Sequence, residues 1–142
     1  MKRKVFFAVL FIGFTCSAFG QNVKFDYVVK DGKITITGLI ASSGVKDLII
    51  PASIDGWPVV AIGAGAFEKS QLTSVTLPNS VVTIGERAFL QNKLTSIIIP
   101  NSVVTIGTGA FWVNPITSVV IPNTVLNYSR RSFSNTTEIR RP

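Results

Sequence analysis

The sequence predicts a β-dominated α/β solenoid of 22-residue coils with a β-hairpin cap on its N-terminal side. Three observations lead to this prediction: a motif that returns at a fixed period, a strand-like alternation inside each copy, and an Asp-Gly turn between two alternating segments before the first copy. Repeats of roughly 20–50 residues with regular apolar columns are typical of solenoids. An active site needs its residues only once, so this repetition favours a scaffold or a binding surface.

The repeat is defined by the pattern Ile-Gly-x-x-Ala-Phe. It occurs at residues 62–67, 84–89 and 106–111, which are 22 residues apart each time. A fourth, degenerate copy begins at Tyr128 and keeps Phe133. We therefore expect about three full repeats and a degenerate one over residues 61–133. The other columns in register are Leu72, Leu94 and Ile116; Val75, Ile97 and Val119; Leu77, Ile99 and Ile121; Pro78, Pro100 and Pro122; and Asn79, Asn101 and Asn123.

Each copy predicts one strand and one return segment. In LTSVTL, residues 72–77, apolar and polar side chains alternate as in a strand with one buried face. The proline that follows has no N–H to give to a ladder and ends the strand. The spacing of the next apolar set fits a short helical or 3₁₀ segment that packs back on the strand. This set comprises Val81, Ile84, Ala88 and Phe89. The glycines of the motif, Gly63, Gly85 and Gly107, are expected at tight bends.

The segments that flank the repeats predict a cap and a tail. Within residues 21–60, Phe25, Tyr27 and Val29 alternate with other residues before the turn sequence KDGK, and Ile34 and Ile36 follow it. This is the pattern of a hairpin with an Asp-Gly turn. The sequence DLIIP, residues 47–51, predicts a further strand before the first full motif. Residues 134–142 lose the repeat pattern and are expected to form a basic C-terminal tail.

The first 20 residues predict a secretory signal peptide. A basic start at residues 2–4 is followed by an apolar run at 5–14 and by small residues up to Gly20, after which cleavage is expected. Cys16 as a lipid attachment site is the less favoured alternative, because Phe14 and Thr15 precede it rather than small residues. Both interpretations place the chain outside the cytoplasm, either secreted or at the cell surface or outer membrane. No later stretch reaches the roughly 20 apolar residues of a membrane span.

Composition argues against nucleic-acid binding and against catalysis. Of 14 basic residues, three lie in the signal segment, and the remaining 11 exceed the 7 acidic residues by only four. The three full repeats hold only Lys69, Arg87 and Lys93, and four further arginines (Arg130, Arg131, Arg140 and Arg141) crowd the end of the sequence, whereas a nucleic-acid site needs a basic face with aromatic residues. The absence of histidine, and of cysteine beyond Cys16, excludes histidine-based triads, thiol nucleophiles and the common zinc sites. The carboxylates do not cluster, so we predict no catalytic residue, no metal and no cofactor.

The repeats resemble a known family. The segments IPASIDGWPVVAIGAGAF, LTSVTLPNSVVTIGERAF and ITSVVIPNTV closely resemble the BspA-like, Treponema pallidum type of leucine-rich repeat, over about residues 30–133. The resemblance implies a short leucine-rich-repeat array in an exported protein of the bacterial or protozoan surface. It also implies adhesin-like binding of host matrix proteins such as fibronectin, or of other bacteria. Family members often carry a cysteine three residues after the phenylalanine, where this chain has Ser70, Asn92 and Asn114, and many members are longer.

The outward positions of the repeat strands are the candidate binding site. They form two columns, which comprise Ser74, Ser96 and Ser118, and Thr76, Ile98 and Val120. The second column is partly apolar, as in a protein-binding patch, although β-branched residues also favour strands for local reasons. Trp112 is the candidate anchor: it either points outward as an interface residue or shields the last intact coil. Trp57 is expected to pack.

Two functional hypotheses follow. The first is a non-catalytic, exported protein that binds protein or glycan partners through the sheet face. Its partners would be host extracellular-matrix or cell-surface proteins, or other bacterial surface proteins. The alternative is a truncated or accessory repeat protein that self-associates through an uncapped C-terminal coil, because an unpaired strand edge favours such association.

Overall fold

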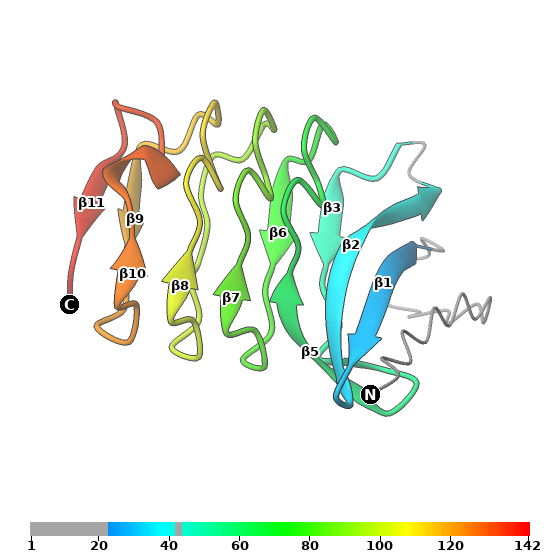
Figure 1. The fold of residues 1–142 in the computed structure, drawn as a ribbon. Helices are drawn as coiled ribbons and strands as arrows, with labels where there is room; N and C mark the ends of the chain where they lie inside the picture. Colours follow the sequence, from blue (N-terminus) through cyan, green and yellow to red (C-terminus); the bar gives the residue numbers. More distant parts are fainter. Residues whose placement is uncertain (1–22, 42–43) are drawn as a thin grey trace.

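The computed structural model describes residues 23–41 and 44–142. The predicted signal peptide and Cys16 lie outside the described residues. The chain forms a β-solenoid of about five turns, with the hairpin cap at one end and the C-terminal coil at the other (Figure 1). The predicted β-dominated solenoid with its 22-residue coils is confirmed.

The cap is an antiparallel hairpin. β1 (Lys24–Lys30) pairs with β2 (Lys33–Ala41), and the turn between them places Asp31 and Gly32 at φ angles of 52° and 69°. Such left-handed conformations are why an Asp-Gly pair suits this turn. β2 then pairs in parallel with β5 (Trp57–Ile62), and β4 (Ser53–Ile54) forms a second short hairpin with β5. The cap therefore joins the first coil directly through β2.

One sheet runs along the whole solenoid, and we call it the continuous sheet. Its order is β1-β2-β5-β7-β8-β10, and Figure 1 shows β7, β8 and β10 side by side. These strands are β7 (Thr83–Ile84), β8 (Thr105–Ile106) and β10 (Asn127–Tyr128). Their pairs are parallel, and the motif isoleucines Ile62, Ile84 and Ile106 are in register. The buried isoleucines of successive copies therefore lie one above the other.

The predicted helical return segment is wrong. The second apolar set, Val81 to Phe89, forms β7 and a turn, and the only helix among the described residues is the 3₁₀ helix η1 (Arg130–Ser132). The run Val-Val-Thr-Ile at residues 81–84 is β-branched throughout. Such residues lose side-chain freedom in a helix and pack well in a sheet. The helix-like spacing arises because the chain turns between Ile84 and Ala88, so both reach the core from different directions.

A second sheet is broken in the middle, and we call it the interrupted sheet. β3 (Asp47–Ile49) pairs in parallel with β6 (Ser74–Thr76), and β9 (Ser118–Val120) pairs in parallel with β11 (Glu138–Arg140). Residues 95–99 occupy the coil between β6 and β9 but form no strand, and among the described residues they have no backbone hydrogen bond to either neighbour. Residues 134–142, which were expected to form a tail, contribute β11 to this sheet.

A column of phenylalanine rings fills the core. Phe67, Phe89, Phe111 and Phe133 are fully buried, and successive ring centroids are 5.2, 5.3 and 5.2 Å apart with interplanar angles of 21°, 6° and 11°. This spacing is the offset-stacked arrangement that aromatic pairs favour. Phe133, the one motif residue that the degenerate copy keeps, continues the stack. The degenerate copy therefore packs on the third repeat as the full copies pack on one another.

The motif glycines are required by close approach between coils. A Cβ at Gly85 would lie 2.7 Å from the backbone nitrogen of Ala64, and a Cβ at Gly107 would collide with the backbone nitrogen of Glu86. Neither glycine has a left-handed φ. The requirement is therefore space for the preceding coil, and not the tight bend that the sequence suggested.

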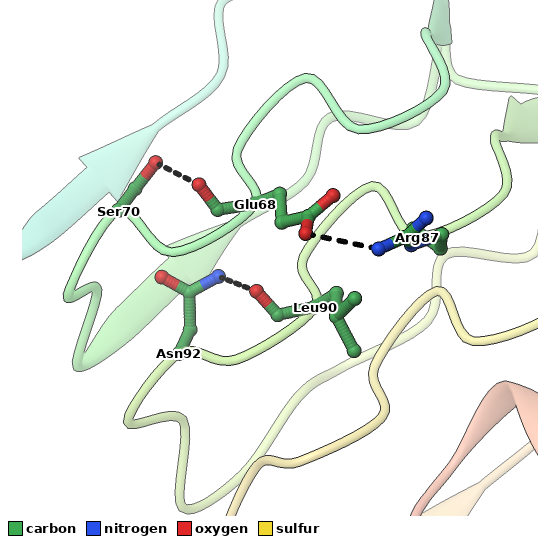
Figure 2. A network of polar contacts seen from close by, with 5 residues as sticks. All are labelled: Glu68, Ser70, Arg87, Leu90 and Asn92. Atoms are coloured by element: carbon green, nitrogen blue, oxygen red, sulfur yellow. Dashed lines mark hydrogen bonds and ion pairs between the residues drawn. The ribbon is translucent and has the colours of Figure 1, made fainter.

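Buried asparagines join the coils where the resemblance leads one to expect cysteine. The Asn92 Oδ1 accepts a hydrogen bond from the Leu72 backbone N–H at 3.0 Å, and its Nδ2 donates to the Phe67 carbonyl at 2.8 Å. Asn114 repeats both bonds one coil later, to Leu94 N–H at 3.1 Å and to the Phe89 carbonyl at 2.8 Å. Figure 2 shows the further hydrogen bond from Asn92 Nδ2 to the Leu90 carbonyl (3.4 Å) and, separately, the ion pair between Glu68 and Arg87 (3.2 Å). The two amides form a ladder that satisfies backbone groups of the preceding coil.

The asparagine ladder gives a stability prediction. Asn92→Ala leaves two buried backbone groups of the preceding coil unpaired, and each unsatisfied group costs roughly 1–3 kcal/mol. We expect the free energy of unfolding, measured by urea denaturation, to fall by about 2 kcal/mol or more. Asn79→Ala at an exposed asparagine is the control and should change it by less than about 0.5 kcal/mol. Equal effects of the two substitutions would contradict the ladder.

The backbone at Val113 gives a prediction of the opposite sign. Val113 is exposed and has a φ of 56°, a conformation that β-branched residues rarely adopt. Asparagine tolerates it. Val113→Asn should therefore raise the free energy of unfolding by about 1 kcal/mol. Val82→Asn is the matched control, because Val82 is also an exposed valine but its φ is not left-handed. Stabilisation by both substitutions, or by neither, would sink this explanation.

Candidate functional site

The interrupted sheet presents the candidate residues to solvent. Ser74, Ser96, Ser118, Thr76, Ile98 and Val120 are all exposed, as the alternation predicted. The side chains between them point inward: Val75 is half-buried, and Ile97 and Val119 are buried. Ser96 and Ile98 lie on the unpaired residues 95–99 rather than on a strand, which differs from the expectation of one uniform sheet. Binding by these residues stays a prediction.

The structure extends both columns beyond the residues chosen from the sequence. In the β3–β6 pair, Asp47 lies opposite Ser74 and Ile49 lies opposite Thr76. In the β9–β11 pair, Glu138 lies opposite Ser118 and Arg140 lies opposite Val120. The alternation in Asp47-Leu-Ile and Glu138-Ile-Arg is a sequence signal for these positions, but both copies depart from the 22-residue period, so the period alone does not place them in the columns.

An exposed apolar centre lies between charged ends. Ile98 is 85% exposed and Val120 is 53% exposed, and Ile49 is also exposed on β3. Isolated surface hydrophobics are ordinary, but aligned ones on one face are typical of interaction sites. The charged residues of these columns lie only at the two ends, with Asp47 on β3 and the pair Glu138 and Arg140 on β11. The centre of the face is therefore suited to a partner that buries apolar side chains.

A shallow groove of about 350 Å³ opens beside this centre. Its lining comes from three successive coils, namely Ile97, Ile98, Ile99 and Asn101; Ser118, Val119, Val120 and Pro122; and Arg140 and Pro142. Residues 95–99 form no backbone hydrogen bond to β9, whereas β9 is paired with β11 on its other side. The groove therefore crosses both the unpaired segment and the paired strands at the C-terminal end of the interrupted sheet.

The charged groups at the two ends are already partnered. Arg140 donates from Nε to Glu138 Oε1 at 2.9 Å and from Nη2 to Oε2 at 2.8 Å. These hydrogen bonds and the opposite charge lower the pKa of Glu138 and raise the pKa of Arg140. Asp47 accepts hydrogen bonds from Ser74 Oγ at 2.9 Å and from Thr73 Oγ1 at 3.3 Å. Among the residues that line the groove, Arg140 is the only one with a charged side chain.

Trp112 is half-buried and does not line the groove. It follows Phe111 in the turn segment and occupies the column of Glu68 and Leu90, which are also half-buried. Its backbone belongs to the coil-to-coil contacts, since its carbonyl accepts a hydrogen bond from Gln91 N–H at 3.0 Å. The structure therefore does not bring Trp112 together with the sheet columns, and an anchor role stays a prediction.

The C-terminal coil is partly covered by Arg141. Its guanidinium lies 5.2 Å from the centroid of the Tyr128 ring and donates to the carbonyls of Pro122 (2.9 Å) and Val125 (3.2 Å). Guanidinium groups favour this position over an aromatic face. Arg130, Arg131 and Arg140 add further positive charge to the same coil. Self-association through this coil stays a prediction, and like charges would oppose contact between two such ends.

Within residues 23–41 and 44–142, no group of three or more histidine, cysteine or acidic residues could hold a metal ion. No helix in the same part of the chain has the length and apolar character needed to cross a bilayer.

Comparisons with known proteins agree with the geometry. A family profile described as BspA type leucine rich repeat region (6 copies) matches residues 41–141. A leucine-rich repeat protein from Bacteroides capillosus is 27% identical with a TM-score of 0.69, over 83% of this chain and 94% of that one. The T. pallidum leucine rich repeat protein is 25% identical with a TM-score of 0.55, over 79% of this chain and 62% of that one.

A third structure, a leucine-rich repeat protein from Bacteroides ovatus, shares the fold at 21% identity and a TM-score of 0.58. The match covers 84% of this chain and 39% of that one. This chain therefore spans less than two thirds of both the T. pallidum and the B. ovatus chains. Among curated proteins there is no significant match.

A separate aromatic cluster stabilises the cap. Tyr27 donates a hydrogen bond from its hydroxyl to Asp55 Oδ2 at 3.0 Å, and Trp57 packs over the Gly32 turn while half of it stays exposed. Burial raises the pKa of Tyr27, and the hydrogen bond to Asp55 and its charge raise that pKa further. The packing predicted for Trp57 thus links the two hairpins of the cap.

This cluster gives a pH prediction. Because the folded-state pKa of Tyr27 is raised above its ordinary value of 10.0, its stabilising contribution is present at neutral pH and is lost as pH rises through the folded-state pKa. Asp55→Asn removes the charge and should lower the Tyr27 titration midpoint. Ultraviolet titration of the phenolate in a Tyr128→Phe background reports Tyr27 alone, since the chain has two tyrosines. An unchanged midpoint in Asp55→Asn would contradict the assigned cause.

Proposed function

The chain belongs to the BspA-type leucine-rich repeat family, and we propose that it is a non-catalytic, exported protein that binds other proteins through the interrupted sheet. Members of this family generally serve as protein-interaction scaffolds. The observation that carries the proposal is the exposure of Ile98, at 85%, between the exposed apolar residues Ile49 and Val120 on the same face. Burying such side chains against a partner is favourable without any catalytic group.

The energy available at this centre is enough for an anchor. Full burial of an isoleucine or valine side chain contributes roughly 1.5–3 kcal/mol. Ile98 and Val120 together could therefore supply several kcal/mol, whereas the hydroxyls of Ser74, Ser96 and Ser118 can form a polar surround. Interfaces commonly combine a small apolar centre with a hydrated polar rim. The arrangement supports binding of a protein surface better than binding of a small, highly charged ligand.

The partner class follows from the sequence and the resemblance. The basic and apolar pattern of residues 1–20 supports export, and the resemblance to surface repeat proteins supports host matrix or cell-surface proteins as partners. Fibronectin is the first partner to test. Glycans and other bacterial surface proteins are the further classes that the same face could meet.

The test is a pair of double substitutions. Ile98→Lys with Val120→Lys places two charges in the apolar centre, while Val82→Lys with Leu126→Lys places the same two charges elsewhere. Val82 and Leu126 are 41% and 75% exposed and flank strands of the continuous sheet. Binding to immobilised fibronectin and a panel of other matrix proteins is measured by surface plasmon resonance near physiological salt, with circular dichroism to check folding.

We expect the first variant to lose binding by about 30-fold or more, because both anchor side chains are lost and two charges would be buried. The second variant should bind like the unmodified protein. Equal affinity of the unmodified protein and the Ile98→Lys, Val120→Lys variant would exclude the interrupted sheet as the binding face. Absence of binding to every partner tested, by a folded protein, would overturn the matrix-protein proposal.

A further inference from the structure

The third repeat differs from the other two at the edge where the chain passes from the continuous sheet to the interrupted sheet. We call this the turn edge, and its turns lie side by side at the top of Figure 1. Each copy carries a dipeptide there, directly after its motif phenylalanine. These dipeptides are Glu68-Lys69, Leu90-Gln91 and Trp112-Val113. The first two contain a long polar side chain and the third is entirely apolar, so the copies give an internal comparison on one backbone.

The fold does not explain the valine of the third dipeptide. Lys69, Gln91 and Val113 share a left-handed backbone, with φ angles of 56°, 54° and 56°. A β-branched side chain is the least suited of the three to this conformation. Val113 is also 49% exposed, so burial in the core does not offset the strain. Strained residues of this kind gather at functional sites, which makes the turn a candidate for one.

The same turn leaves a backbone donor without a partner. In the earlier copies this donor bonds to the next coil, with Lys69 N–H on the Leu90 carbonyl at 2.8 Å and Gln91 N–H on the Trp112 carbonyl at 3.0 Å. Val113 N–H makes no such bond within the described part of the chain. Val113 therefore offers a partner a backbone donor as well as an exposed apolar side chain.

The backbone of Trp112 is held firmly beside this donor. Its N–H donates to the Gly109 carbonyl at 3.0 Å, and its carbonyl accepts from Gln91 N–H at 3.0 Å and from Asn114 Nδ2 at 3.4 Å. Trp112 is half-buried, so it keeps a surface for a partner and has little freedom to lose on binding. Tryptophan is also one of the residues that most often anchor protein interfaces.

The charge beside the turn is positive. Gly109 lies next to both groups: its N–H donates to the Arg131 carbonyl at 2.9 Å, and a Cβ placed on it would lie 4.0 Å from the Trp112 Cβ. Arg131 is exposed, and the ion pairs found among the described residues involve other arginines. No aspartate or glutamate occurs between Glu86 and Glu138. A carboxylate of a partner would be attracted to this turn, whereas a basic partner would be repelled.

We propose that Trp112 and Val113 form a second protein-binding site, on the turn edge, for a partner that presents an apolar side chain with a carboxylate beside it. The apolar side chain packs on Trp112 and Val113, and the carboxylate lies near Arg131. This inference goes beyond the proposed function, because it uses no residue of the sheet columns. A second copy of the chain and an anionic membrane surface are the other occupants, and the experiment separates them.

The probe is a phage library of linear 12-residue peptides, selected on the Ile98→Lys, Val120→Lys variant so that the sheet columns do not contribute. The comparison selection uses the same variant with Trp112→Leu and Val113→Gln added, which gives the third turn the dipeptide of the second copy. The second copy already holds that dipeptide at nearly the same φ, so the fold should be kept. We expect only the first selection to enrich peptides in which aspartate or glutamate neighbours a large apolar residue.

The strongest peptide is then synthesised, and its affinity is measured by fluorescence polarisation. Trp112→Leu with Val113→Gln should weaken binding about tenfold or more, because both apolar contacts are lost. Arg131→Gln should weaken it about threefold, and Lys33→Gln at an exposed lysine of the cap is the matched control with no expected effect. Val113→Asn should weaken binding about threefold while it stabilises the fold, a combination that a purely structural role of the turn would not produce.

Each outcome decides the proposal. It is overturned if no peptide is enriched over the comparison selection, if Trp112→Leu with Val113→Gln leaves the affinity unchanged, or if Arg131→Gln acts no more strongly than Lys33→Gln. Binding to phosphatidylglycerol vesicles that this double substitution abolishes would assign the turn to a membrane surface instead. Dimerisation abolished in the same way would assign it to a second copy. Peptide binding with the expected pattern supports the site even where matrix proteins fail to bind, since that failure overturns only the proposed partners of the interrupted sheet.

Discussion

The distance between successive coils is the constraint on which the rest of the structure depends. Backbone strands that share a ladder lie about 4.8 Å apart, and the phenylalanine rings, 5.2 to 5.3 Å apart between centroids, stack at nearly the same repeat. At this spacing a Cβ at Gly85 would collide with the coil before it, so the motif must keep a glycine there. Asn92 and Asn114 span the same distance with their side-chain amides. The stacked phenylalanine rings, the motif glycines and the asparagine amides are thus all fitted to the same distance between coils.

Backbone hydrogen bonds between coils hold that spacing on some sides of the coil and are missing from the middle of the interrupted sheet. The continuous sheet is hydrogen-bonded from β1 to β10, and the turn segments add bonds such as Phe67 N–H to the Ala88 carbonyl (2.8 Å) and Phe89 N–H to the Ala110 carbonyl (2.7 Å). The interrupted sheet is bonded only at its two ends. A scaffold held elsewhere can leave one stretch without backbone hydrogen bonds and keep its shape, and that stretch carries Ile98. The same division of roles supports a rigid protein with a local recognition surface.

Much of the fold could be predicted from the sequence, because periodicity and alternation report burial directly. The 22-residue register located the stacked phenylalanines, and the alternation around Val75 and Val119 located the outward columns. The return segment was wrong because spacing alone could not distinguish a helix from a short strand followed by a turn, and the β-branched run at residues 81–84 decided for the strand. The interruption at residues 95–99 could not be predicted, since their sequence matches that of β9 closely. β11 was missed because its copy is two residues shorter than the period, with Glu138 opposite Ser118.

Amide hydrogen exchange, followed residue by residue by NMR, tests the central claim most directly. A ladder amide exchanges only when its hydrogen bond opens, so protection separates bonded strands from a segment without backbone hydrogen bonds. The account predicts strong protection at Phe89 and Phe111, whose amides donate to the next coil at 2.7 Å, and weak protection at residues 96–98. Protection at residues 96–98 equal to that at Phe89 and Phe111 would show a continuous ladder and would contradict the interruption of the sheet at Ile98.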